Sequence, residues 1–548
     1  MKQFYYNHLF FKMLEWVVIG VCLVAILFHL FGLSQTMLFN EDIWLWGKFD
    51  LNNFWFTVDP IHYAPLTNLL FALSYEFLPL WGPWSHLQMM ILYLIFIALC
   101  FRFFHKILQL PSWITWLGIG LLTSFPFLTE GTFWIFGAHS FHSVIWFLAT
   151  LNLLPEKDRQ NLWRYWIAPG TTLLIMLSSS PVTYPSYFLL LFYFAVRFHK
   201  NRHLLFFWGV LFLIGLFYIY LRNLLNYQDG WAFLSPTESH YAIAAQSFPV
   251  HYLQSMVEIL EYSNPVIVLQ RYIFQGFLSQ SPLDLASLLH LLWVLPAWGI
   301  ILVRDFSKAR EIFLYGAGAA GVILVTASPH PTRYMIPLIF VQTTGILLLL
   351  QHLIHPLQIF RKTIFLMLGL CLMGSNLSIK MKAEWFQWLI PKQIEQSVLD
   401  IAVQAKEQDP PLIFINHKIW KKIRFADYHY TGGDSASFGE LRKVLEYAKF
   451  PRCIYQGYLQ DADSEEIEMV HNENDSVFEN SHRTRYTCPA VLKPLQSAHC
   501  FEYDNSRELF GGEFKRISGF ATVPGSLGVD PENWRKHEKT FDIKVQCI

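Results

Sequence analysis

Residues 11–33 read FKMLEWVVIGVCLVAILFHLFGL, an apolar stretch long enough to cross a bilayer as a single helix. Lys2 and Lys12 lie at its start and no small-residue cleavage site follows, so we expect a retained anchor rather than a cleaved signal peptide. Similar runs recur at 87–104, 110–127, 138–154, 164–180, 182–197, 204–221, 284–303, 311–327, 335–353 and 363–377. Each run is near the ~20 residues of a spanning helix, which predicts an all-α bundle of about eleven transmembrane helices.

The composition also indicates lipid rather than water as the main solvent. Of the 548 residues, 53% are hydrophobic and 15% are charged, whereas soluble domains carry about 25% charged residues. The 41 basic and 41 acidic residues cancel, so no global field favours nucleic acid. A large buried core would also raise the apolar fraction, but the length of the runs argues for membrane spans.

The positions of the cations predict the orientation, because Lys and Arg concentrate in short cytoplasmic loops. With a cytoplasmic N-terminus, every second loop is basic and the opposite loops hold few cations before residue 380. The basic loops contain Arg102/Lys106, Lys157/Arg159/Arg164, Arg197/Lys200/Arg202, Arg304/Lys308/Arg310 and Arg361/Lys362. An odd number of spans then places the C-terminal part outside the cytoplasm, in a multi-pass protein of a bacterial inner or plasma membrane or of the endoplasmic reticulum.

The chain divides into a transmembrane domain, 1–380, and a soluble extracytoplasmic domain, 381–548. Two long outer loops, 34–84 and 222–284, are expected to be functional, since long structureless connections are uncommon. In the tail, 411–416 (PLIFIN) predicts a buried strand and 438–450 has helical spacing, which together indicate a mixed α/β domain.

The cysteines of the tail suit an oxidising compartment. Cys453, Cys488, Cys500 and Cys547 allow up to two disulfides in any of three connectivities. Four free thiols are the alternative, and a zinc site is disfavoured because no pair has the C-x₂₋₄-C spacing.

Several ionisable residues lie at the outer ends of the spans. Glu41 and Asp42 follow the first span in an aromatic setting, where a carboxylate makes a usable general base or metal ligand. A solvated acidic pair is the alternative interpretation. His62 and Tyr63 lie further along the same loop and either contact a ligand or fix the loop.

Two later segments add candidates. Glu130 lies at a membrane boundary, and His139 and His142 are spaced to share one helix face. Ionisable groups at such depths are functional candidates, although the histidines could simply bond to each other inside the bundle. His330, Arg333 and Tyr334 form a short outer turn, where the lone cation suits a phosphate or, alternatively, a lipid headgroup.

In this order the segments resemble the GT-C superfamily of membrane glycosyltransferases, closest to the protein O-mannosyltransferase-like branch. The family's acidic pair, its Tyr-Arg-Pro-Leu stretch and its Gly…His-Leu segment are matched in turn by Glu41-Asp42, by Tyr63-Ala64-Pro65-Leu66, and by Gly82 with His86-Leu87. Its later Pro…Glu…Trp…Gly and Arg-Tyr…Pro patterns are matched by Pro126, Glu130, Trp134 and Gly137, then by Arg333, Tyr334 and Pro337. The acidic order is reversed relative to the mannosyltransferases, and Ala64 replaces the arginine.

The resemblance implies transfer of a sugar from a polyprenyl-phosphate donor, with inversion, to a protein or glycan acceptor outside the cytoplasm. Glu41 or Asp42 would be the catalytic base, while His62, Tyr63, Glu130, His139, His142, His330, Arg333 and Tyr334 would bind the substrates. No cofactor is required by the pattern, and a divalent metal is possible without being signalled.

Two other functions fit a polytopic chain. A transporter or lipid flippase would carry ionisable groups near the middle of the membrane. A non-catalytic scaffold that displays the tail domain would leave the ionisable residues scattered rather than convergent.

The topology leads to a labelling prediction. A membrane-impermeant thiol reagent added from outside should modify a cysteine placed at Val470 and spare one placed at Lys200, because the tail and the basic loop lie on opposite faces. The reverse pattern in intact cells would overturn the orientation, and with it an extracytoplasmic reaction.

Overall fold

The computed structural model describes the helical region and the strands of the tail. In the helical region the described residues are 2–35, 51, 54, 65–78, 84–133, 139–153, 165–177, 203–225, 299, 336–354 and 359–389. In the tail they are 412–417, 454–459, 467–470, 498–504, 513–522, 541–542 and 546–547.

Most of the apolar runs that can be compared are helices. The long helices are α1 (Lys2–Ser34), α3 (Pro65–Phe77), α4 (Leu87–Arg102), α5 (Ser112–Ser124), α7 (His139–Leu153), α8 (Ile167–Leu177), α10 (His203–Leu225), α16 (Ile336–Ile354) and α17 (Ile359–Ala383). The short ones are η1 (Phe103–Ile107), η2 (Pro126–Leu128), α6 (Glu130–Phe133) and η7 (Glu384–Leu389). Pro65 begins α3, as its fixed backbone angle suits the first helical turn.

Four of these helices are long and apolar enough to cross a membrane: His8–Ser34, Leu87–Ile107, Ile336–Leu353 and Ile359–Ser378. The expected runs at 182–197 and 311–327, and nearly all of 284–303, lie outside the described residues. The protein is therefore a helical bundle with at least these four candidate spans, and the count of about eleven stays a prediction.

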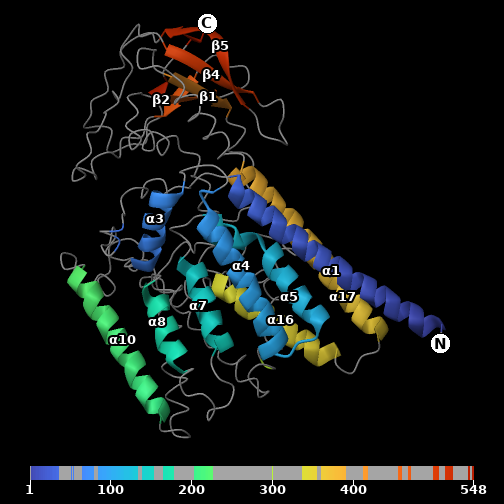
Figure 1. The fold of residues 1–548 in the computed structure, drawn as a ribbon. Helices are drawn as coiled ribbons and strands as arrows, with labels where there is room; N and C mark the ends of the chain where they lie inside the picture. The colour runs from blue at the N-terminus through green and yellow to red at the C-terminus, as the bar shows by residue number, and fades with distance from the viewer. Residues whose placement is uncertain are drawn as a thin grey trace, which may run out of the picture.

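The first and last described spans pack side by side. Helix α1 lies along both α5 and α17 (Figure 1). Gly120 of α5 allows this close approach, because a Cβ there would overlap Met373 of α17 and lie 2.9 Å from the Cys22 sulfur of α1. The outward face of α1 exposes large apolar side chains such as Trp16 and Leu27, as expected of a surface that faces lipid.

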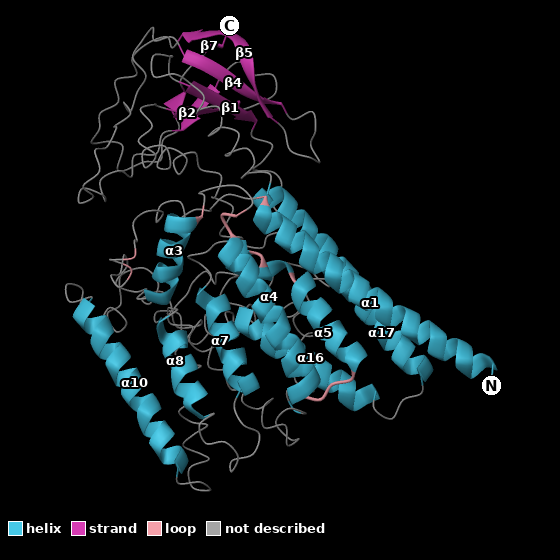
Figure 2. Cartoon of the chain, viewed as in Figure 1, coloured by secondary structure: helices cyan, strands magenta, loops and turns pink. Residues whose placement is uncertain are grey.

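The described part of the tail is one seven-stranded sheet, ordered β6-β3-β2-β1-β4-β5-β7 (Figure 2). The strands are β1 (Leu412–His417), β2 (Ile454–Leu459), β3 (Ile467–Val470), β4 (Ala498–Asp504), β5 (Glu513–Thr522), β6 (Phe541–Asp542) and β7 (Gln546–Cys547). The expected strand at 411–416 is β1, at the centre. It pairs in parallel with β2 and β4, an arrangement that requires crossover connections. The expected helix 438–450 lies outside the described residues.

Two of the four tail cysteines lie on described strands. Cys500 lies on β4 and Cys547 on β7, and β5 separates these strands. Cys453 and Cys488 lie outside the described residues, so the disulfides expected in the tail stay a prediction.

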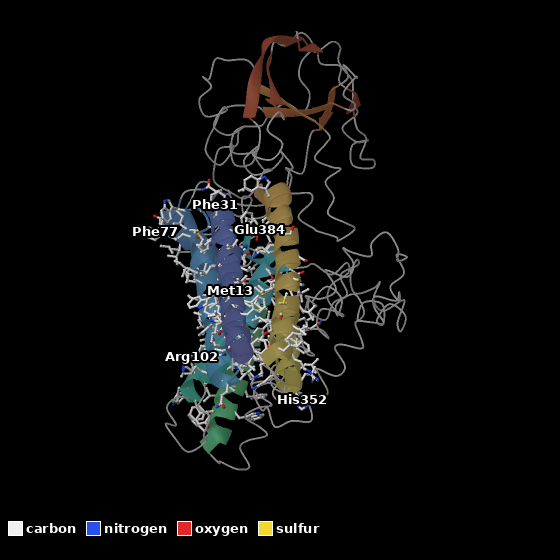
Figure 3. All side chains as sticks on the ribbon, turned by 90° about the vertical axis from the view of Figure 1, so that its right-hand side faces the viewer. Met13, Phe31, Phe77, Arg102, His352 and Glu384 are labelled. Atoms are coloured by element: carbon white, nitrogen blue, oxygen red, sulfur yellow. The ribbon has the colours of Figure 1, made fainter. Side chains whose placement is uncertain are left out.

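The two ends of the bundle differ in chemistry. Phe31 and Glu384 lie at the end nearer the sheet, whereas Arg102 and His352 lie at the opposite end (Figure 3). We call these the sheet-side end and the basic end.

Candidate functional site

Three of the predicted site residues fall within the described part of the chain. Glu130 begins the short helix α6, His139 begins α7, and His142 lies one turn further along α7. The remaining predicted residues lie outside the described residues: Glu41, Asp42, His62, Tyr63, His330, Arg333 and Tyr334.

His142 joins the first outer loop to α7. Its ring is 2% exposed, and Nδ1 lies 3.4 Å from Thr67 Oγ1 on α3. The adjacent Asn68 side chain donates a hydrogen bond to the Phe54 carbonyl oxygen at 3.1 Å. Among the described residues, His142 Nε2 has no hydrogen-bond partner. Nδ1 therefore faces Thr67, whereas Nε2 can form a hydrogen bond with a group outside the described residues.

His86 joins the start of α4 to the segment that carries Glu130. Nε2 donates to the Phe133 carbonyl oxygen at 2.9 Å, while Nδ1 accepts from Ser85 Oγ at 3.0 Å. The carbonyl can only accept, so this pairing fixes the proton on Nε2. His86 thereby holds the end of α6 at the sheet-side end of the bundle.

A buried charge cluster, His29, Lys380 and Glu384, lies at the same end (Figure 3 labels Glu384). His29 Nδ1 donates to Glu384 Oε1 at 2.5 Å, and Lys380 Nζ lies 3.5 Å from that oxygen. Lys380 also donates to the Thr123 carbonyl oxygen at 2.6 Å. The side chains are 0% or 1% exposed. The cluster therefore connects α1, α5 and α17 through charges that are shielded from solvent.

Two threonines extend the cluster into the Glu130 segment. Thr129 Oγ1 donates to Glu384 Oε1 at 2.9 Å, and Thr132 Oγ1 lies 2.9 Å from His29 Nε2. Thr129 and Thr132 lie on either side of Glu130 in the sequence. The cluster therefore contacts the chain both before and after this predicted site residue.

The pair Lys380–Glu384 is the electrostatic centre of the cluster. Burial tends to raise the pKa of the Glu384 carboxyl, but Lys380, His29 and the Thr129 hydrogen bond outweigh it and hold that pKa below its ordinary value. Burial lowers the pKa of Lys380, and Glu384 opposes this in part. The carboxylate is thus stabilised by its partners rather than by water.

Sequence reasoning missed this cluster because its parts fall in different predicted units. His29 lies within the first apolar run, while Glu384 lies beyond the expected boundary at 380. In the structure α17 runs to Ala383 and η7 to Leu389, so the last helix of the bundle continues past that boundary. An acid and a base spaced i, i+4 directly after an apolar run are the available signal.

Within the described ranges, no group of three or more His, Cys, Asp or Glu side chains could hold a metal ion. His29, His86 and His142 instead face hydroxyl, carbonyl or carboxylate groups. The described geometry is that of a hydrogen-bonded polar centre.

No family model matches this chain, and no curated protein matches it. Among solved structures, the crystal structure of ArnT from Cupriavidus metallidurans bound to undecaprenyl phosphate is similar. The chains are 12% identical, the TM-score is 0.44, and the similarity covers 81% of this chain and 93% of that chain. A TM-score of this size does not establish a shared fold, so the similarity assigns neither a family nor an activity to this chain.

The charge cluster predicts a strong coupling between its members. Lys380→Met should lower the free energy of unfolding by about 3–5 kcal/mol, because it leaves a buried carboxylate without its cation. Glu384→Gln should also destabilise, by stranding the ammonium. Combining Lys380→Met with Glu384→Gln should restore most of the lost free energy of unfolding, since the two neutral side chains leave no buried charge without a partner. Thermal unfolding in detergent measures this cycle, and additive losses would contradict the coupling.

The native protein and the Lys380→Met variant should respond differently to pH between 7 and 5, where the Glu384 contribution is constant in the native protein and changes in the variant. In the native protein the lowered pKa of Glu384 contributes stability above the unfolded value, about 4.3, and this contribution disappears as the pH falls. In the Lys380→Met variant burial dominates and the neutral acid is favoured, so stability should rise as the pH falls from 7 to 5. Unfolding temperatures measured over this range distinguish the two.

Proposed function

We propose that this chain is a membrane glycosyltransferase that moves a sugar from a polyprenyl-phosphate donor to a protein or glycan acceptor, with inversion, outside the cytoplasm. The observation that carries the proposal is the meeting of separate sequence segments at one end of the bundle. The first outer loop contacts α7 through Thr67 and His142, and the start of α4 contacts α6 through His86 and Phe133. Described residues from three of the segments that resemble the GT-C pattern, 65–68, 86–87 and 126–133, thus contact one another or α7 at this end. This arrangement supports a single reaction centre.

The location also suits a donor that stays in the bilayer. Helix α3 buries Thr67 and Asn68 but exposes Leu73 and Phe77, and Phe77 is 72% exposed near the sheet-side end (Figure 3). An apolar surface at that level can accommodate a polyprenyl tail, which leaves lipid only at a cost of ~0.8 kcal/mol per CH₂. The donor would therefore enter sideways from the membrane.

The proposed reaction is a single displacement. Glu41 or Asp42 takes the proton of the acceptor hydroxyl, whose oxygen forms a bond to the anomeric carbon from the face opposite the phosphate. The bond from that carbon to the phosphate oxygen breaks, and the lipid phosphate leaves with the electron pair. Arg333 and His330 stabilise its charge. His62, Tyr63, Glu130, His139, His142 and Tyr334 surround the donor and acceptor.

Transport is less well supported. A transporter places ionisable groups near the middle of the membrane, between broken helices. The buried cluster described above instead lies at the sheet-side end, where Figure 3 places both Glu384 and Phe31. A scaffold would have no need to bring the loop, α4 and α6–α7 segments together.

The assignment of the catalytic base to Glu41 or Asp42 is tested by substituting each carboxylate with its amide. Glu41→Gln and Asp42→Asn should leave folding intact, and one of them should reduce transfer by at least about 10²-fold, the size of a general-base contribution. Transfer is measured with purified protein and synthetic polyprenyl-phosphate sugars. Glu76→Gln is the control, because Glu76 is an exposed acid on α3 in the same loop region. If both amide variants keep full transfer, the base lies elsewhere or the proposal is wrong.

A further inference from the structure

We propose that Glu384 and His29 are positioning residues. They fix the place of residues 126–133, the segment that carries Glu130, and Lys380 compensates the negative charge of Glu384. This assignment rests on the proposed function for its catalytic consequence. Its structural part, the attachment of the segment to α1 and η7, stands on the contacts below.

The segment 126–133 is too short to hold its own position. It consists of η2, with three residues, and α6, with four. Isolated helices of this length are unstable in water and gain their order from tertiary contacts. The orientation of Glu130 relative to a substrate therefore depends on the groups that hold its neighbours.

Those groups are side chains of α1 and of η7, which directly follows α17. Thr129, directly before Glu130, donates to Glu384 Oε1 at 2.9 Å. Thr132, two residues after it, lies 2.9 Å from His29 through its hydroxyl. A carboxylate acceptor strengthens the first bond, since hydrogen bonds to charged groups exceed neutral ones. Both attachments are shielded from water, which removes competition for them.

Packing limits the segment on its remaining side. The Phe133 ring meets the His29 ring edge-on, with centroids 5.3 Å apart. A Cβ on Gly32 would lie 2.8 Å from Phe133 Cζ, so only glycine leaves room for the ring at that place. The Phe133 carbonyl is held in turn by His86. The segment is thus fixed from α1, η7 and α4.

The energetics favour a positional role over a stabilising one. A buried ion pair can usually be replaced by apolar residues without loss, because desolvation offsets the Coulomb attraction. A role in fixing one arrangement of segment 126–133 explains why a charged pair, Lys380 and Glu384, lies at this buried position. Glu384 also opens a π-helical turn, and such turns are frequent at functional sites.

The test removes the hydrogen bond between Thr129 and Glu384 and compares the result with the loss of a buried threonine hydrogen bond elsewhere in the bundle. Thr129→Val deletes the hydroxyl that reaches Glu384 while conserving shape. Thr150→Val is the matched control: Thr150 is also fully buried, and its hydroxyl donates to Thr171 at 2.6 Å between α7 and α8. Thr129→Ser keeps the hydroxyl and serves as the rescue variant. Steady-state kinetics are measured per folded protein in all three.

Thr129→Val should lower kcat/KM about tenfold to a hundredfold, since a small misplacement of a substrate-binding group has effects of this size. Thr129→Ser should restore most of the rate, and Thr150→Val should match the parent. If the two valine variants have equal kcat/KM values, or serine does not restore the rate, the positioning role is wrong.

Hydrogen exchange supplies a readout that does not depend on activity. Amides of 129–133 should exchange faster in Thr129→Val than in the parent or in Thr150→Val, because the segment opens more readily once its attachment is lost. Unchanged exchange there would overturn the attachment itself. If the parent transfers no sugar while exchange still responds in this way, the proposed function fails and the attachment stands.

Discussion

The buried carboxylate of Glu384 is the interaction on which the sheet-side end of this bundle depends. One oxygen, Oε1, faces His29, Thr129 and Lys380, which come from three different parts of the chain. A charge without water needs such partners, since its desolvation is otherwise too costly. The requirement fixes where α1 ends relative to α17, and where the short segment between α5 and α7 lies. The first and last described spans are consequently coupled at the end where the predicted chemistry is located.

The lipid-facing part of the fold could be predicted from sequence because it depends on local composition. Apolar runs of spanning length predicted the bounds of α4 and α16 closely, whereas α1 and α17 extend beyond the expected runs at 11–33 and 363–377. The stretch at 411–416 predicted a strand, which is β1 of the tail sheet. In each case the decisive signal is contained within a single window of sequence, where length and periodicity act directly.

The buried polar contacts could not be predicted in the same way, because they join distant residues. His29 and Glu384 are 355 positions apart, and Thr129 and Glu384 are 255 apart. A histidine in an apolar run reads as ordinary packing until its partner is known, and an acid just beyond a span reads as the start of a soluble domain. The segments of the candidate site also combine local signals, which the sequence contains, with long-range contacts, which it does not reveal. Sequence order indicated that Glu130, His139 and His142 belong to one centre, but only the structure pairs Thr67 with His142 and His86 with Phe133.

The central claim is that donor chemistry takes place at the sheet-side end, between the first outer loop and the segment held by the charge cluster. The most direct measurement is an electron cryomicroscopy map of the protein with a bound polyprenyl-phosphate sugar. The account predicts phosphate and sugar density at that end, with His142 Nε2 within hydrogen-bond reach of the ligand and the lipid tail leaving sideways past α3. Density at the basic end near Arg102 and His352, or in the middle of the bundle, would contradict it.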